Sequence, residues 1–130
     1  LEIRATKTGR ATATLHTFYR MDDGSYLAFF EAPDRPFEFK DQHDFDLHIA
    51  LEVSEKHLHA MLAKGKAAGI ETRGPADHGF LHSIYFRDPN GYVIELCAKR
   101  ANHDALMDPA HNGSRDKLRR WTAAKADKAA

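Results

Sequence analysis

The stretch HGFLHSIYFRDPNGYVIEL, residues 78–96, is typical of two strands joined by a tight turn. Its centre, DPNG at 88–91, suits a type I turn in which proline presets φ and glycine takes the left-handed conformation. In a hairpin this combination makes a three-residue loop with a bulge at the glycine, so the residues that flank the loop pair with each other. Counting back along both strands places Tyr85 directly opposite Glu95. Directly opposed residues share a face, so the turn predicts that the phenol and the carboxylate point the same way.

The segment upstream of this hairpin predicts a strand followed by a helix. In LHIALEV, residues 47–53, apolar side chains alternate with histidine, alanine and glutamate. Ser54 is a typical helix N-cap and Gly69 a typical C-terminal stop, and an apolar stripe at helical spacing runs between them. IETRG, residues 70–74, follows as a short strand. The order from 47 to 97 is therefore strand, helix and three strands.

His48 lies on the polar side of the 47–53 strand. If the apolar side packs on the helix, His48 faces the opposite, concave side of the sheet, where Tyr85 and Glu95 can also point. A neutral imidazole and a carboxylate that meet in one site can both bind a divalent metal ion. The alternative is that His48 and Glu95 lie on a solvated face of the sheet.

The ends of the chain carry weaker patterns. Residues 1–14 lack firm periodicity, and we expect a loop or a frayed strand there. The aromatic stretches at 15–21 and 26–31 flank a turn-prone DDGS and predict a second hairpin. Residues 32–46 contain two prolines and five acidic residues, which indicates a linking segment.

The C-terminal region turns polar after Arg100. The sequence SRDKLRRWTAAKADKAA at 114–130 predicts a helix, with Leu118 and Trp121 as the side chains that dock it.

Composition bounds the possible partners and the compartment. The chain has 130 residues, 42% of them apolar and 29% charged, which fits one domain of ordinary globular type. Nineteen basic and nineteen acidic side chains cancel, so no large field of one sign favours nucleic acid or anionic lipid. From the hydropathy pattern we expect neither a membrane span nor a signal peptide, and the single Cys97 excludes an internal disulfide. We therefore expect a reducing, cytoplasmic location.

The segments LHIALEV and GPADHGFLHSIYFRDPNGYVIEL resemble the vicinal oxygen chelate superfamily. This superfamily includes glyoxalase I, fosfomycin and bleomycin resistance proteins and type I extradiol ring-cleaving dioxygenases. The resemblance covers roughly residues 15–100, and IYFRDPNGYVIEL is its most specific part. It implies an α+β fold of paired βαβββ modules that form an open, curved, mixed sheet around a central cavity.

Under this resemblance, residues 1–130 form a single domain of three parts. Residues 1–40 would be a partial first module without its N-terminal strand and helix, 41–100 the second module, and 101–130 a C-terminal loop and helix. The first metal ligand of the superfamily lies on a strand that would precede Leu1. We therefore expect the third ligand to come from residues outside this sequence or from another chain. The alternative is that this copy has no working metal site.

The resemblance also implies roles for individual residues. His48 and Glu95 would be metal ligands, and Glu31 would match the extra carboxylate ligand of the glyoxalase I branch. The stretch GPADHGFLHSIYF looks most like the extradiol dioxygenases. By that likeness His78 is the acid–base histidine and Tyr85 is the phenol that contacts substrate.

The function that the resemblance implies first is an extradiol dioxygenase of a small catecholic substrate that uses Fe(II) or Mn(II). The alternatives are a glyoxalase I-like lyase or isomerase that uses Zn(II) or Ni(II), and a non-catalytic module that binds a small molecule such as an antibiotic. In each case His82 and His16 are further candidates for contacts with the small molecule. We expect a homodimer, and we expect neither nucleic acid nor membrane as a partner.

Overall fold

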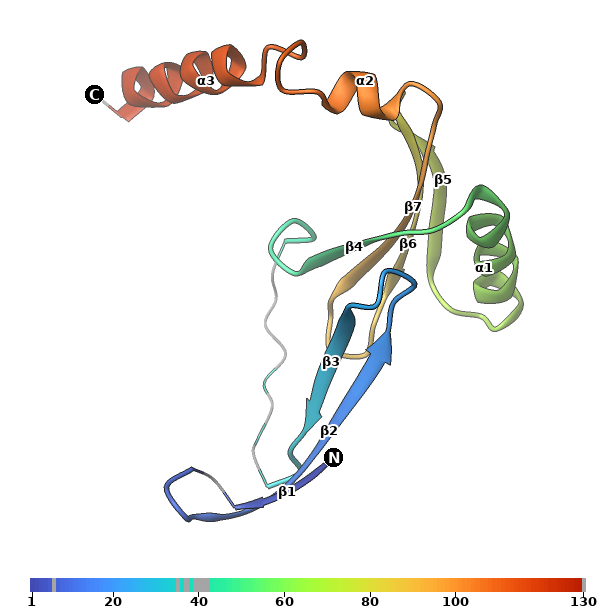
Figure 1. Cartoon of the computed structure of the whole chain (residues 1–130), viewed down its shortest axis with the longest axis vertical. Coiled ribbons are helices and arrows are strands. Elements are labelled where there is room, and N and C mark those ends of the chain that lie inside the picture. The colour runs from blue at the N-terminus through green and yellow to red at the C-terminus, as the bar shows by residue number, and fades with distance from the viewer. Residues whose placement is uncertain (6, 35, 37, 39–42, 130) are drawn as a thin grey trace. The chain divides into compact units, whose positions relative to one another are not determined.

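The computed structural model describes residues 1–5, 7–34, 36, 38 and 43–129, and the chain divides into two compact units. Unit 1 comprises residues 1–39 and unit 2 comprises residues 40–130. Figure 1 labels the helices and strands of both units. Unit 1 holds a three-stranded sheet, and unit 2 holds a four-stranded mixed sheet with helices. The predicted α+β class with open sheets is confirmed.

Unit 1 is an antiparallel sheet of order β1-β2-β3. Its strands are β1 (Glu2–Ala5), β2 (Ala11–Arg20) and β3 (Tyr26–Glu31). The predicted second hairpin is confirmed: Met21 N donates to Ser25 O at 2.8 Å, and Gly24 takes a φ of +86° in the turn.

The expectation of a loop or frayed strand at residues 1–14 holds only for the turn at residues 7–10. Residues 2–5 form β1, and β2 begins at Ala11, earlier than predicted. Thr12 and Thr14 alternate with more exposed neighbours and are partly buried, and their side-chain oxygens lie 3.1 Å apart. Threonine is β-branched and favours strands, so this short alternation extends the strand although it contains almost no large apolar residue.

Unit 2 contains the predicted order of strand, helix and three strands. Its elements are β4 (His48–Glu52), α1 (Glu55–Ala67), β5 (Thr72–Asp77), β6 (Leu81–Arg87), β7 (Val93–Lys99), α2 (His103–Met107) and α3 (Ser114–Ala129). The sheet order is β4-β7-β6-β5, with β4 parallel to β7 and the other pairs antiparallel. This is one βαβββ module, in which the first strand pairs with the last.

The turn between β6 and β7 has the predicted geometry. Asp88 N donates to Tyr92 O at 2.9 Å, and Gly91 takes a φ of +89°. The Asp88 carboxylate stabilises the loop, because its Oδ1 accepts a hydrogen bond from Tyr92 N at 2.8 Å. The resulting register pairs Tyr85 with Glu95, as the turn residues predict.

Helix α1 begins and ends at the predicted residues. Ser54 Oγ accepts a hydrogen bond from His57 N at 3.2 Å at the N-terminus. At the other end Gly69 takes a φ of +68°, and Ile70 N donates to Gly65 O at 3.0 Å. This glycine-terminated end satisfies carbonyl groups that the last turn would otherwise leave free.

The hydrophobic core of unit 2 lies between α1 and one face of the sheet (Figure 1). Its centre is Leu58 of α1, which is fully buried against Ile84 and Leu96. The partly buried apolar side chains around this centre are Leu51, Val53, Met61, Leu62 and Phe86. The apolar side of the 47–53 strand therefore packs on the helix as predicted, and the opposite face of the sheet carries the polar side chains.

The C-terminal helix α3 is confirmed, but its predicted docking residues are exposed. Leu118 is 64% exposed and Trp121 is 67% exposed. These are the only large apolar side chains that the sequence offers α3, amid arginine, lysine and aspartate, which is too little apolar surface to bury a helix face.

Among the described residues, no helix is long and apolar enough to cross a bilayer.

The predicted linking segment at 32–46 is described only in part. Positions 35, 37 and 39–42 lie outside the described residues. Its end is a turn in which Asp46 N donates to His43 O at 2.9 Å.

Candidate active site

One row of side chains crosses the polar face of the unit 2 sheet from strand to strand. The register pairs Ala50 of β4 with Glu95 of β7, Glu95 with Tyr85 of β6, and Tyr85 with Arg73 of β5. Directly paired residues share a face, so these four side chains point the same way. His48 lies two residues before Ala50 and shares this face by the alternation of the strand.

His48 and Glu95 contact each other on this face. His48 Nε2 and Glu95 Oε2 lie 2.8 Å apart, and the two side chains are 27% and 13% exposed. The predicted meeting of imidazole and carboxylate is therefore present, and the carboxylate is well shielded from solvent. The alternative of two separate solvated side chains does not describe this pair.

The spacing of the pair is compatible with shared coordination of one ion. Two ligands that each bind an ion at about 2.1 Å, with about 90° between them, lie about 3 Å apart. The donors are an imidazole nitrogen and a carboxylate oxygen, which both suit Mn(II), Fe(II), Zn(II) and Ni(II). Within the described part of the chain, no group of three or more His, Cys, Asp or Glu side chains is arranged to hold a metal ion. His48 and Glu95 would thus supply two ligands.

Tyr85 connects this pair to a second histidine. The Tyr85 Oη lies 2.7 Å from His78 Nε2, and the Tyr85 ring meets the His48 ring edge-on at a centroid distance of 6.1 Å. Burial raises the pKa of the Tyr85 phenol, and the negative charge of the neighbouring Glu95 carboxylate raises this pKa further. The phenol is therefore held in its protonated form at neutral pH, where it can donate a hydrogen bond.

His78 reaches this position from the loop between β5 and β6. Its backbone N donates to Leu81 O at 2.9 Å, which fixes the loop as it enters β6. The structure thus brings together four of the residues singled out from the sequence: His48, Glu95, Tyr85 and His78.

Arg73 and Asp44 belong to the same face, and sequence reasoning missed both. The Arg73 guanidinium carbon lies 5.7 Å from the centre of the Tyr85 ring, and Arg73 Nη2 donates to Asp44 Oδ2 at 2.9 Å. Arg87 Nη2 also contacts Asp44, through Oδ1. Hydrogen bonds from Arg87 and then Arg73 lower the pKa of the Asp44 carboxyl, so Asp44 stays ionised.

A bulge in β5 explains why the sequence pattern did not reveal Arg73. The pairs Asp77–His82 and Ala76–Ser83 follow one register, and the register shifts by one residue between Ala76 and Arg73. A shift of one residue moves a side chain to the other face of the sheet. Without the bulge Arg73 would point towards α1. The Gly-Pro pair inside the shift, at 74–75, was the available signal, because both residue types mark bulges in strands.

His82 does not join this cluster. His82 and Tyr85 lie on opposite faces of β6. His82 faces α1, where its Nδ1 lies 2.9 Å from Glu55 Oε1. The predicted contact of His82 with a small molecule in the same site therefore receives no support from its position.

His16 and Glu31 lie in unit 1, on opposite faces of its sheet. His16 pairs with Phe30 and stacks on that ring at a centroid distance of 3.8 Å, whereas Glu31 pairs with Leu15. The Nε2 atom of His16 is buried and has no hydrogen-bond partner among the described residues. Because the two faces differ, His16 and Glu31 cannot both line one concave surface of this sheet.

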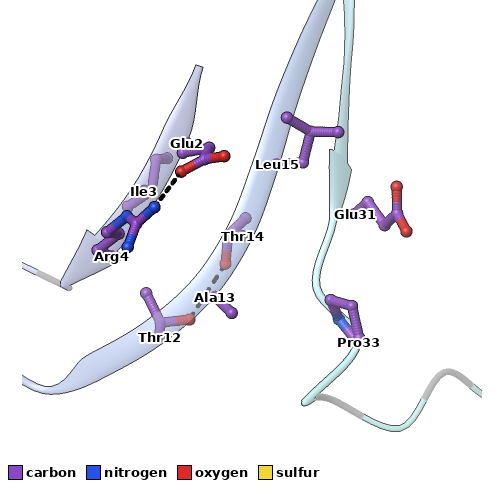
Figure 2. Close-up of a pocket in the computed structure, with 9 residues that line it drawn as sticks. All are labelled: Glu2, Ile3, Arg4, Thr12, Ala13, Thr14, Leu15, Glu31 and Pro33. Atoms are coloured by element: carbon purple, nitrogen blue, oxygen red, sulfur yellow. Dashed lines mark hydrogen bonds and ion pairs between the residues drawn. The ribbon is translucent and has the colours of Figure 1, made fainter.

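Glu31 borders a pocket of about 600 Å³ that unit 1 forms by itself (Figure 2). The side chains drawn there include the Arg4–Glu2 ion pair, with Nη2 and Oε2 2.7 Å apart. None of the described residues that line this pocket is a histidine. Its donor set therefore differs from the imidazole and carboxylate pair of unit 2.

Comparisons with known proteins give a partial match in sequence. No protein-family model matches the chain. The chain is 38% identical over 61 residues to a probable lactoylglutathione lyase of Vibrio cholerae serotype O1. This match covers 45% of the chain and 44% of the lyase, so the chain matches less than half of the length of that relative.

The solved structures give a match in fold. A monoclinic form of FosX, the genomically encoded fosfomycin resistance protein of Listeria monocytogenes, aligns with a TM-score of 0.50 at 22% identity. The alignment covers 79% of this chain and 74% of FosX. FosX complexed with Mn(II) and sulfate aligns with a TM-score of 0.49 at 23% identity, over 68% of this chain and 66% of FosX.

Neither protein is an extradiol dioxygenase by name, so the dioxygenase part of the prediction stays a prediction. The likeness to FosX supports the predicted fold. The sequence match to a probable lyase is limited to 61 residues, so the relationship to the vicinal oxygen chelate superfamily is carried as a proposal.

Proposed function

We propose that this chain is a metal-dependent enzyme that acts on a small molecule with adjacent oxygen atoms. The observation that carries the proposal is the 2.8 Å contact between His48 Nε2 and Glu95 Oε2 on the polar face of the sheet, where the Glu95 side chain is 13% exposed. A divalent ion bound at such a pair supplies a Lewis acid that polarises substrate oxygen atoms. His48 and Glu95 would hold this ion, together with ligands that the described residues do not provide.

The remaining residues of the cluster can move a proton and orient the substrate. Burial and the Glu95 carboxylate raise the pKa of the Tyr85 phenol, which keeps its proton. The phenol donates a hydrogen bond to an oxygen of a substrate bound on the polar face, beside Glu95. The His78 imidazole, 2.7 Å from Tyr85 Oη, can replace the proton that the phenol gives to the substrate oxygen and can take it back when the phenol is protonated again. The Tyr85 ring meets the His48 ring edge-on, which places it beside the pair.

The leading activity in this proposal is that of a lyase or isomerase of the glyoxalase I type. It is supported by the 38% identity to a probable lactoylglutathione lyase, a protein named for cleavage of lactoylglutathione. In this reaction Glu95 or His78 moves a proton between adjacent carbon and oxygen atoms of the substrate. Zn(II) or Ni(II) are the ions expected for it, because no oxygen is consumed.

A second candidate activity is the extradiol cleavage of a small catechol with Fe(II) or Mn(II). The observation that favours it is the contact between His78 and Tyr85, which are the acid–base histidine and the substrate-binding phenol expected from the resemblance. The third candidate is a non-catalytic module. In that case the same face of the sheet would bind a small molecule but would not convert it.

A direct test compares activity and metal content of the purified chain. We expect the protein loaded with Zn(II) or Ni(II) to form lactoylglutathione from methylglyoxal and glutathione, followed by the absorbance of the thioester. The second arm measures oxygen uptake with catechol after loading with Fe(II). His48→Ala should abolish whichever activity is present, and His59→Ala, an exposed histidine on α1, should not.

The outcomes of this test separate the three candidates. Thioester formation without oxygen uptake supports the lyase, and oxygen uptake alone supports the dioxygenase. Metal binding or ligand binding without either turnover supports the binding module. A chain that binds no metal at the His48 and Glu95 pair contradicts the proposal.

Homodimerisation also stays a proposal. Unit 1 carries exposed aromatic side chains on both faces of its sheet, including Tyr19 at 61% and Phe30 at 64%. Such surface is typical of interfaces. Sedimentation equilibrium should give twice the chain mass, and Phe30→Ser should shift the equilibrium towards monomer.

A further inference from the structure

Arg73 lies where it can contact a substrate bound at the proposed metal pair. It pairs across the strands with Tyr85, which pairs with Glu95, so the guanidinium and the carboxylate belong to the same row. Strands are spaced by about 4.8 Å, which separates the backbones of Arg73 and Glu95 by about 10 Å. The ring of Tyr85 occupies the space between them, and the guanidinium carbon lies 5.7 Å from its centre.

The guanidinium of Arg73 has donors to offer a ligand. The side chain is 51% exposed, and its hydrogen bond to Asp44 engages Nη2. A longer ion pair joins its Nε to Glu71 Oε1 at 3.9 Å, beyond hydrogen-bond distance. A planar guanidinium presents several N–H groups in a fork that matches the two oxygens of a carboxylate or a phosphonate.

Asp44 is arranged so that Arg73 can turn to a ligand at small cost. Asp44 contacts both Arg73 and Arg87, each through a different carboxylate oxygen. When Arg73 rotates to an incoming anion, Asp44 keeps Arg87 as its partner and is not left as an uncompensated charge. Arg87 is held in place independently, because its Nη1 donates to Gly91 O at 3.0 Å.

We propose that Arg73 is a specificity residue that binds an anionic group of the substrate, a carboxylate or a phosphonate, across the Tyr85 ring from the His48 and Glu95 pair. This inference rests on the proposed function and narrows it to substrates that carry both adjacent oxygen atoms and an anionic group about one ring's width away. The ring of Tyr85 forms the floor on which the middle of such a molecule lies.

The test uses a matched pair of small probes on the Mn(II)-loaded chain under anaerobic conditions. Catechol carries the adjacent oxygen atoms alone, and 3,4-dihydroxybenzoate adds a carboxylate across the ring. Calorimetric titration gives the ratio of the two Kd values. We expect wild type to prefer the benzoate, and Arg73→Gln to lose this preference by about tenfold or more, because a charge-assisted bidentate contact is removed. Because catechol lacks the carboxylate, its Kd serves as the reference within each variant.

Two further variants make the test specific. Arg119→Gln removes the same charge on α3, where Arg119 contacts Asp116, and should keep the wild-type preference. Arg73→Lys keeps the charge but not the fork, and should retain only part of the preference.

A separate arm keeps this inference distinguishable from the proposed function. Methylphosphonate is titrated into metal-free protein while the side-chain Nε–H signal of Arg73 is followed by NMR. A saturable shift in wild type that Arg119→Gln retains supports the anion site even if no metal binds. If methylphosphonate leaves the Arg73 signal unmoved, or if Arg73→Gln retains the full preference for the benzoate, the inference is overturned.

Discussion

His48 Nε2 and Glu95 Oε2 lie 2.8 Å apart although 47 positions separate the two residues in the chain. The contact exists because β4 pairs in parallel with β7, which places Ala50 beside Glu95. His48 lies two residues before Ala50 and therefore points to the same face. The helix α1 covers the other face and buries the apolar residues there. The polar pair is therefore a consequence of which face the helix occupies.

The bulge in β5 is expected to depend on Gly74. Its φ is +105°, and a Cβ at this position would lie 2.6 Å from Ser83 O. Gly74→Ala should therefore lower the free energy of unfolding by about 2 kcal/mol, through backbone strain and this contact. Urea denaturation measures the change. Gly113→Ala is the control, because Gly113 has a φ of +65° and open space around a Cβ. Equal losses in the two variants would contradict the role of the Ser83 contact.

The Tyr85 hydroxyl is expected to matter for turnover more than for folding. Tyr85→Phe removes the partner of His78 Nε2 and should reduce kcat of the metal-loaded protein about 100-fold. The free energy of unfolding should fall by only about 1 kcal/mol, because one hydrogen bond is lost. The affinity for metal should be unchanged. Tyr92→Phe in the neighbouring turn serves as control, and a similar kcat in Tyr85→Phe and Tyr92→Phe would argue against a role of the phenol.

Glu55 is expected to stabilise the chain in a pH-dependent way. Its Oε1 lies 2.9 Å from His82 Nδ1 and 3.2 Å from His59 Nε2, and the hydrogen bond from His82 lowers the pKa of Glu55 below its ordinary 4.5. A lowered folded-state pKa means that this stabilisation is fully present above the unfolded value and is lost as pH falls through the folded value.

The measurement for Glu55 is a series of melting temperatures against pH. Glu55→Gln should melt below wild type at pH 6, and the two curves should converge as pH falls below 4.5. Glu71→Gln, whose nearest ion pair spans 3.9 Å to Arg73, is the matched control and should show a smaller gap. A gap for Glu55→Gln that persists unchanged into acid would contradict the ion-pair explanation.

Much of unit 2 is predictable from local sequence. The loop at 88–91 determines the pairing of Tyr85 with Glu95, since turn chemistry sets hairpin register. Alternation in the 47–53 strand predicts the face of His48, and capping residues predict the ends of α1. These features follow from interactions among residues near one another in the chain, which explains why a single sequence reveals them.

Features that depend on distant contacts were not predictable in the same way. Asp44 belongs to the predicted linking segment, and its contacts with Arg73 and Arg87 span 29 and 43 positions of the chain. Arg73 changes face at a bulge, which breaks the alternation that sequence analysis counts. The strand at 2–5 forms through its pairing with β2, since its own pattern is weak.

The measurement that tests the account most directly is metal binding by the His48 and Glu95 pair. Mn(II) is titrated into metal-free protein, and bound ion is quantified by electron paramagnetic resonance. We predict one bound ion per chain in wild type, with affinity at least about tenfold weaker in His48→Ala and in Glu95→Gln. His59→Ala should bind like wild type. Equal affinity in His48→Ala, Glu95→Gln and wild type would contradict the proposed metal site, even if the fold is unchanged.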